Sequence, residues 1–298
     1  MQEFQLLAQL VLPGLTTGCV YALIALGFVL CFNVSGVVNM AQGEYVMLGG
    51  VLGAWMVIVG VPLAVALIAA TAAGAILGIV QERLTLAPVR RSPAFIQITV
   101  TLGVAVILRG IALIIFGKDP LAMPGFSGDG GFAMLGAMLP VQALWVWGTT
   151  ALMLLGIFWF LQYTDAGRAV RACSINLVAA RLMGVNAERM TMMVFALAGG
   201  TGALAGAVIT PIVLDSWDAG FVCSLKGFIG AILGGLRSPI IAVVGGLGVG
   251  IAESLAAGYV SSGWKDAIVY GLLLAFLLIR GGVFLSGRVG LVAGTSDR

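Results

Sequence analysis

Long apolar runs follow one another along almost the whole chain and are separated by short polar stretches. They cover roughly residues 6–31, 37–59, 62–82, 94–116, 141–162, 191–214, 239–259 and 264–280, and a shorter run that glycines interrupt covers about 220–236. A helix of about 20 apolar residues crosses roughly 30 Å of hydrocarbon. Because runs of this length favour helices over strands, the pattern predicts an all-α polytopic membrane protein with about 8–9 transmembrane helices in a single domain, residues 1–298.

Glycines recur four residues apart inside these runs. In lipid, this spacing lets two helix backbones approach closely, so we interpret the pairs as packing positions of a tight bundle. The pairs are Gly14/Gly18, Gly74/Gly78, Gly202/Gly206 and Gly246/Gly250.

Composition agrees with a lipid environment and narrows the function. The chain is 61% hydrophobic and 9% charged, whereas soluble domains carry about 25% charged residues. It has no histidine, which argues against most zinc enzymes and Ser-His hydrolases, and we expect neither a catalytic nor a metal site. It also lacks a GxxxxGK[ST] loop, so we expect no ATP site of that kind in this chain. The net charge of +3 gives no indication of a nucleic-acid partner.

The charges between the runs predict an orientation. Arginines gather at 83–91, at 168–189 and from 280 onward, whereas acidic residues gather at 117–139 and 215–219. Because cytoplasmic loops collect Lys and Arg, we place the arginine loops in the cytoplasm and the acidic loops outside. The chain then crosses between Asp218 and Arg237, so the run 220–236 is a short or broken span. The N-terminus lies outside, unless 37–50 is re-entrant, in which case it lies inside.

The longest cytoplasmic segment in this orientation, residues 163–190, is too polar to span and too patterned for a loose linker. Ser174 or Asn176 can cap the start of a short helix, and Gly184 can end it in the left-handed conformation. Asn186 with Glu188 then offers a second helix start before the next span.

This short cytoplasmic helix carries apolar residues without a core of its own. We expect Leu177, Ala180, Leu182 and Met183 to lie toward one side of it. Such a helix favours docking to a partner protein. The alternative is an amphipathic helix that rests on the membrane surface.

Ionisable residues fall within or near the apolar runs at Glu44, Arg109, Lys226 and Glu253. A charge at bilayer depth is costly and marks a pathway, a cavity or a buried pair. Arg109 lies about seven residues from one end of its run, roughly 10 Å deep at 1.5 Å per residue, and pairing with Glu44 or Glu253 is a reasonable structural role. Glu253 is more typical of helix packing than of solute contact, and Lys226 is a candidate for the path.

Two interrupted segments, residues 41–50 and 224–239, resemble each other. Each combines a charge, spaced glycines and the letters LGG, and interrupted spans at corresponding positions are typical of a transport site near the midplane. Our hypothesis is that Gly43 breaks the first helix and that Asn39, Gln42 and Glu44 line or buttress a translocation path. The alternative is that Glu44 pairs with Arg109 and only holds helices together.

Two function classes fit these residues. One is the membrane subunit of a transporter that a separate motor drives, and the structured cytoplasmic helix favours it. The other is an ion-coupled secondary transporter or channel for a small polar solute. Such a carrier usually needs inward-facing carboxylates, for which Glu44 and Glu253 are the candidates.

The chain resembles the permease subunits of branched-chain amino acid ABC importers, and most of all the shorter of the two permeases. The resemblance rests on four stretches that cover nearly the whole chain in order: YALIALGFVLCFNVSGVVNMAQGEYVMLGG (21–50), ERLTLAPVRRSP (82–93), GRAVRACSINLVAARLMGVN (167–186) and FIGAILGGLRSPIIAVVGGLGVGIAESL (228–255). It implies one permease domain whose cytoplasmic coupling loop is 163–190, with Ser174, Leu177, Ala179, Ala180, Leu182 and Gly184 facing an ATPase.

The resemblance also implies a complex in the bacterial inner membrane. Its parts would be this chain, a homologous second permease in a hetero- or homodimer, two ATPase subunits that bind the ATP, and an extracytoplasmic binding protein that delivers a small solute. Relatives move branched-chain and other amino acids, urea, amides or aromatic acids. Two departures affect individual roles: Gln42 stands where relatives have His, and Val178 replaces the acid before Ala179 and Ala180.

Overall fold

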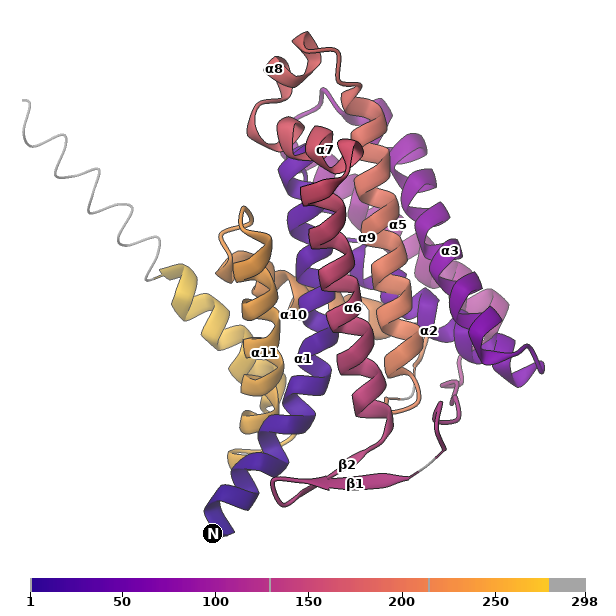
Figure 1. Cartoon of the computed structure of the whole chain (residues 1–298), viewed down its shortest axis with the longest axis vertical. Coiled ribbons are helices and arrows are strands. Elements are labelled where there is room, and N and C mark those ends of the chain that lie inside the picture. The colour runs from indigo at the N-terminus through magenta and orange to yellow at the C-terminus, as the bar shows by residue number, and fades with distance from the viewer. Residues whose placement is uncertain (1, 129, 214, 279–298) are drawn as a thin grey trace, which may run out of the picture.

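The computed structural model describes residues 2–128, 130–213 and 215–278 as a bundle of antiparallel helices (Figure 1). In chain order the elements are α1 (Gln2–Ser35), α2 (Gln42–Ile58), α3 (Leu63–Gln81), the π-helical turn η1 (Glu82–Leu86), α4 (Ala87–Val89), α5 (Ala94–Phe116), β1 (Gly131–Met134), β2 (Ala137–Pro140), α6 (Gln142–Tyr163), α7 (Asp165–Ile175), α8 (Leu177–Leu182), α9 (Ala187–Ile209), α10 (Ala219–Leu233) and α11 (Pro239–Tyr259). Residues 265–278 form a further helix.

Every apolar run in the described residues contains a helix, which confirms the all-α prediction. Six helices of the described chain are long and apolar enough to cross a membrane: α1, α3 with its continuation to Val89, α5, α6, α9 and α11. α2 and α10 have 17 and 15 residues and are shorter than a full span. The last part of the run 264–280, and the arginines beyond 278, lie outside the described residues.

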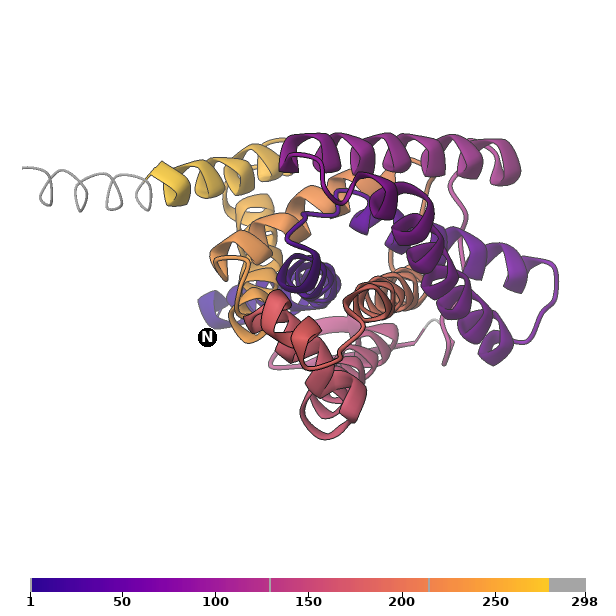
Figure 2. The same ribbon diagram turned by 90° about the horizontal axis from the view of Figure 1, so that it is seen from above.

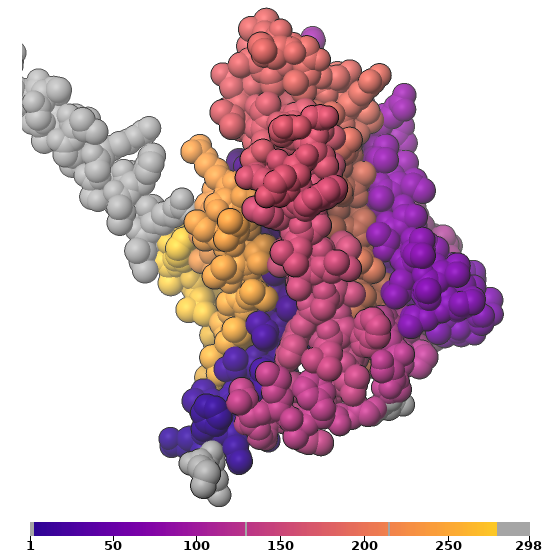
Figure 3. Space-filling view, in the orientation of Figure 1, coloured from indigo at the N-terminus to yellow at the C-terminus, as the bar shows by residue number. Residues whose placement is uncertain are grey.

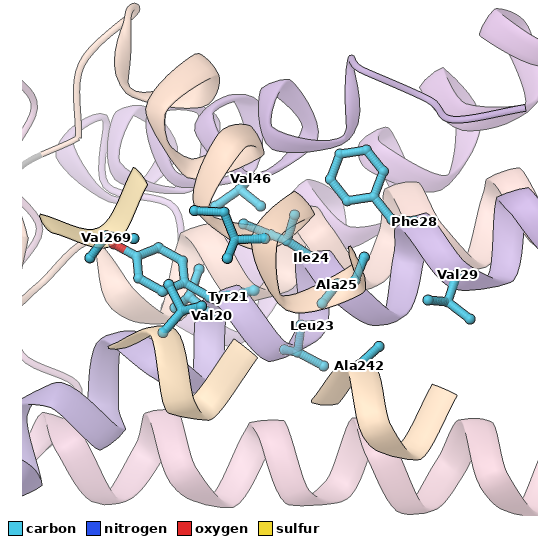
Figure 4. Close-up of a cluster of buried hydrophobic side chains, with 14 residues drawn as sticks. Val20, Tyr21, Leu23, Ile24, Ala25, Phe28, Val29, Val46, Ala242 and Val269 are labelled. Atoms are coloured by element: carbon cyan, nitrogen blue, oxygen red, sulfur yellow. The ribbon is translucent and has the colours of Figure 1, made fainter. Parts of the chain in front are cut away.

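α1 runs through the middle of the bundle and supplies much of the core (Figures 2 and 4). Leu23, Ile24, Phe28 and Val29 are almost completely buried in one apolar cluster that also contains Val46 of α2. Residues 18–31 of α1 are all buried, because α9, α10 and α11 surround this part of the helix. Apolar residues around the whole circumference of this part of α1 are therefore expected.

The predicted glycine pairs lie where helix backbones touch. A Cβ atom at Gly18 would lie 2.9 Å from the carbonyl oxygen of Leu247 on α11, and one at Gly74 would lie 2.5 Å from that of Gly199 on α9. At Gly206 a Cβ would collide with the backbone of Val46 on α2. The glycines therefore set the close packing of α1 on α11, of α3 on α9 and of α9 on α2.

The two ends of the bundle differ. One end, called here the α8 end, carries α7, α8, η1 and α4; the other, called the hairpin end, carries the start of α1 and the β1–β2 hairpin (Figure 1). The hairpin pairs Gly131 with Pro140 and Met134 with Ala137, and its turn places Leu135 and Gly136 at positive φ, as a type I′ turn requires. The predicted loop 117–139 thus contains a short sheet.

The segment 36–58 passes through the bundle in two parts. The chain leaves α1 at Gly36, which has a φ of 74°, and continues without helix to residue 41 before α2 begins. Gln42 lies beside Ala198, midway along α9, and Gly53 lies beside Ala207, near its end. The segment therefore continues away from the α8 end and is not re-entrant, and the start of α1 lies at the end opposite α8.

Candidate functional site

The hypothesis that Gly43 breaks a helix is wrong. α2 begins at Gln42, so Gly43 lies in its first turn, and Gly49 and Gly50 lie well inside it. The interruption is the stretch from Gly36 to residue 41 that precedes α2. Gly43 is needed for another reason, because a Cβ there would lie 2.5 Å from the backbone nitrogen of Ser224 on α10.

The polar residues around the start of α2 are fully buried and face different neighbours. The Asn39 Oδ1 atom accepts hydrogen bonds from the Gln81 Nε2 atom at 2.7 Å and from the backbone of Ala41 at 3.2 Å. The Gln42 Nε2 atom donates to the carbonyl oxygen of Ala198 on α9 at 3.0 Å. Asn39, Gln42 and Glu44 are all 0% exposed, so lipid does not face them.

Glu44 forms an ion pair with Arg109 of α5. The Glu44 Oε1 atom lies 3.0 Å from the Arg109 Nε atom and 2.9 Å from its Nη2 atom, and the guanidinium lies 5.0 Å from the ring centre of Phe221. The Glu44 side chain is 0% exposed, whereas that of Arg109 is 22% exposed. The structure thus pairs Arg109 with Glu44 rather than with Glu253. Of the two charged groups, only the Arg109 side chain is partly exposed.

The two interrupted segments meet at the starts of α2 and α10. The Ser224 hydroxyl donates to the carbonyl oxygen of Met40 at 3.0 Å, and a Cβ at Gly220 would lie 3.0 Å from the Cα of Glu44. Their shared LGG letters have different roles, however. Gly49 is inside a helix, whereas α10 ends before Gly234, with Gly235 and Leu236 at positive φ.

A second buried charge cluster joins α1, α10, α11 and the helix 265–278. The Lys226 Nζ atom lies 2.6 Å from Glu253 and 2.8 Å from Asp266, and the Tyr21 hydroxyl donates to the Glu253 Oε2 atom at 2.8 Å. Sequence reasoning named Lys226 and Glu253 but missed Tyr21 and Asp266. The adjacent charges Lys265 and Asp266 at the start of an apolar run were the available signal.

The segment 163–190 forms two short capped helices. Asn176, not Ser174, caps α8, since its side chain accepts from the backbone nitrogen of Ala179 at 3.0 Å. The Ser174 hydroxyl lies within α7 and bonds to the carbonyl of Arg171. Gly184 has the predicted left-handed conformation, with a φ of 85°, and Asn186 caps α9 as predicted. These local signals determine where α8 begins and ends.

α8 exposes most of its apolar side chains. Ala180 is buried and Leu177 packs partly against the bundle, as expected. Leu182 and Met183, predicted on the same side, are instead 83% and 85% exposed, and Val178 is 68% exposed. In six residues the helix cannot turn all of its apolar groups to one side. In the space-filling view α8 projects at the top of the molecule (Figure 3).

A cavity of about 1000 Å³ opens beside α8 at this end of the bundle. Its walls come from the end of α1, from η1 and α4, from the start of α5, and from α8 and α9. The charged residues that line it are Glu82, Arg90, Arg91, Arg181 and Glu188. The cavity is therefore polar, unlike the lipid-facing sides of the bundle.

The geometry defines a polytopic membrane protein with one buried ion pair at the start of α2, a second that joins α10 to α11, and exposed apolar side chains at α8. Comparison with known proteins gives the family. The family model described as "Branched-chain amino acid transport system / permease component" matches residues 10–277. The chain belongs to this family, and it is the permease subunit of a transporter.

Individual relatives agree with the family. The chain is 32% identical over 293 residues to the high-affinity branched-chain amino acid transport system permease protein LivH of Escherichia coli, with 93% of this chain and 95% of the relative covered. It is 31% identical to LivH of Salmonella typhimurium, with the same coverage. It is 30% identical to BraD of Pseudomonas aeruginosa, with 94% and 96% covered. The resemblance inferred from the sequence is thus confirmed.

Proposed function

We propose that this chain forms one part of the translocation path of an ABC importer in the bacterial inner membrane. The solute is a branched-chain or other small amino acid, in keeping with the names of the relatives. An extracytoplasmic binding protein delivers it, and a homologous second permease completes the path. Two ATPase subunits bind the ATP, so this chain needs no nucleotide of its own.

The observation that carries this proposal is the construction of α8. A short helix held by an Asn cap at one end and a left-handed glycine at the other presents Val178, Leu182 and Met183 to solvent. Apolar groups of this exposure at the end of a bundle favour a partner surface. The arginines at the same end predict that this end is cytoplasmic, where an ATPase subunit would dock.

The Glu44–Arg109 pair is the proposed border of the path. The partly exposed guanidinium lies within a membrane-spanning helix, and lipid is an unfavourable neighbour for it. In this proposal Asn39, Gln42 and Gly43 are buried beside the pair and hold the start of α2 in place. The Lys226–Glu253 pair is a proposed buttress of the path, since both side chains are at least 90% buried.

Two variants of the coupling segment test the proposal. Gly184→Pro removes the left-handed turn, because proline cannot adopt a positive φ, and Leu182→Asp places a charge in the docking surface. We expect either variant to insert normally yet to lose ATP-driven uptake in proteoliposomes of the full complex. Arg168→Gln, in the exposed pair with Asp165, is the matched control and should transport like the wild type.

Unchanged uptake by both variants would contradict the coupling assignment. The energy source is tested with proteoliposomes that contain this chain alone. Solute flux driven there by an ion gradient would refute the ABC assignment in favour of a secondary carrier.

A further inference from the structure

Arg90 lies at the wall of the polar cavity and holds two carboxylates that belong to different parts of the bundle. Its Nη2 atom pairs with Glu82 of η1, and its Nη1 atom lies 3.2 Å from Glu188 of α9. Glu188 is in the first turn of α9, four residues after Gly184, which ends α8. One guanidinium therefore bridges the segment that follows α8 and the π-helical end of α3.

The two halves of this bridge have different surroundings. The Glu82 side chain is 2% exposed, that of Arg90 is 28% exposed and that of Glu188 is 71% exposed. The Glu82 half compensates a buried charge and is needed for folding. The Glu188 half is open to water and contributes little to stability, so a stabilising role does not account for it.

A polar path continues from Glu82 into the bundle. The next residue toward α3 is Gln81, which is 4% exposed. Its Nε2 atom donates to Asn39 at 2.7 Å, and its Oε1 atom accepts from the hydroxyl of Tyr45. Asn39 in turn accepts from the backbone of Ala41, directly before α2. Polar groups thus connect Glu188, beside α8, with the residues next to Gln42 and Glu44.

The start of α5 is tied to the same connection. The Gln97 Nε2 atom donates to the carbonyl of Ser92 at 2.7 Å, which fixes the chain just after Arg90. Four residues further along α5, the Thr101 hydroxyl accepts from the backbone of Met40 at 3.1 Å. The loop that carries Arg90 is therefore linked to the connection before α2 in two ways. One link runs through Glu82, Gln81 and Asn39, and the other runs through α5.

We propose that Arg90 is a positioning residue that transmits movement of α8 to the connection 36–41 and so to the Glu44–Arg109 pair. The inference rests on the proposed function, since an ATPase must move α8 for the bridge to act. In this proposal η1 (Glu82–Leu86) is the element that changes its conformation, because π-helical turns are rare, occur mostly as local bulges in α-helices and are frequent at functional sites. A displacement of Glu188 moves Arg90 and, through it, Glu82. Gln81, at the end of α3, then moves with Glu82, and its hydrogen bond moves Asn39.

The test uses the complete importer in proteoliposomes and measures ATP hydrolysed per solute imported. Glu188→Gln removes only the exposed half of the bridge. Arg90→Lys keeps a cation beside Glu82, but a single ammonium cannot occupy both positions of the guanidinium fork. We expect each variant to raise the ratio by about fivefold or more, the lower range of allosteric coupling, with an unchanged unfolding midpoint for Glu188→Gln.

Arg91→Gln is the matched control, because Arg91 lines the same cavity but forms no ion pair with the residues that the structure describes. We expect the wild-type ratio for it. In the double variant Arg90→Lys/Glu188→Gln the second change should add nothing, because one bridge has already been broken.

A wild-type ratio for Glu188→Gln, or full additivity in the double variant, would overturn the role of Arg90. Failure of the proposed function looks different, because the unaltered complex would then show no ATP-dependent uptake. That result would overturn both proposals. If the wild type shows ATP-dependent uptake and the variants hydrolyse the same amount of ATP per solute imported, only the role of Arg90 is overturned.

Discussion

Removal of the Arg109 guanidinium should destabilise the bundle because it strands a fully buried carboxylate. The Glu44 Oε1 atom receives two hydrogen bonds from Arg109, at 3.0 and 2.9 Å, and the side chain is 0% exposed. Removal of one partner of a buried pair costs about 3–5 kcal/mol. Since Arg109 is itself 22% exposed, we expect Arg109→Met to lose about 3 kcal/mol, at the lower end of that range.

The assay is equilibrium unfolding in mixed micelles with increasing SDS, which gives the free energy of unfolding. The double variant Arg109→Met/Glu44→Gln should lose less than Arg109→Met alone, because no uncompensated charge is left. Arg168→Met is the matched control, and loss of its exposed pair with Asp165 should change the free energy by less than about 1 kcal/mol. An equal, small effect of Arg109→Met and Arg168→Met would refute the reasoning.

The single variant Glu44→Gln separates structure from transport at the same site. It removes the carboxylate charge but keeps the size of the side chain and its ability to accept hydrogen bonds. Normal assembly with lost uptake would support a place on the path. Lost assembly would instead assign the pair to holding α2, α5 and α10 together.

Three further predictions concern packing, the second charge cluster and pH. Gly78→Val should reduce the monodisperse fraction in size-exclusion chromatography, because its Cβ would lie 2.7 Å from the carbonyl carbon of Phe195. Gly103→Val, which has open space around it, should leave that fraction unchanged. Equal behaviour of the two variants would contradict the close packing of α3 on α9. Lys226→Met should lose about 3 kcal/mol of unfolding free energy, because it removes the buried cation that lies 2.6 Å from Glu253. Lys265→Met, whose side chain is 40% exposed and lies 3.4 Å from Glu253, should lose clearly less. The reverse order would make Lys265 the main partner of Glu253. Burial raises the pKa of Asp215, in the loop before α10, well above its usual range, so the stability that its protonated form contributes is present below pH about 3.9 and is lost as pH rises toward the raised value. Asp215→Asn has no such loss, so its thermal midpoint should exceed that of the wild type by more at pH 8 than at pH 4, and an equal difference at both would refute the assignment.

Local signals in the sequence predicted local structure well. Run lengths gave the helices, and Asn186 and Gly184 marked helix ends because capping depends on a few neighbouring residues. Ser174 and Asn176 were equivalent candidates for one cap, and only the actual end of α7 at Ile175 separates them. Gly43 was misjudged because a glycine that permits close packing and a glycine that breaks a helix look the same in sequence.

The long-range contacts of the site were less accessible. Glu44 and Arg109 were joined only as an alternative, because the pairing depends on how α2 and α5 are rotated about their axes. The bonds of Gln81 to Asn39 and of Lys226 to Asp266 span about 40 residues of sequence each. In so apolar a chain the hydrophobic pattern does not tell which face of a helix is inward, so it gives no information on which polar groups meet.

The central place of α1 has a consequence for biosynthesis. Its long-range partner α11 begins at Pro239, about 200 residues after α1 ends at Ser35, and translation at about 5–20 residues per second separates the two by roughly 10–40 s. During that interval the glycine face at Gly14 and Gly18, and the hydroxyl of Tyr21 that later meets Glu253, have no partner from α11. Lipid or the insertion machinery must shelter them, so the earliest described helix to be made is among the last to reach its final contacts.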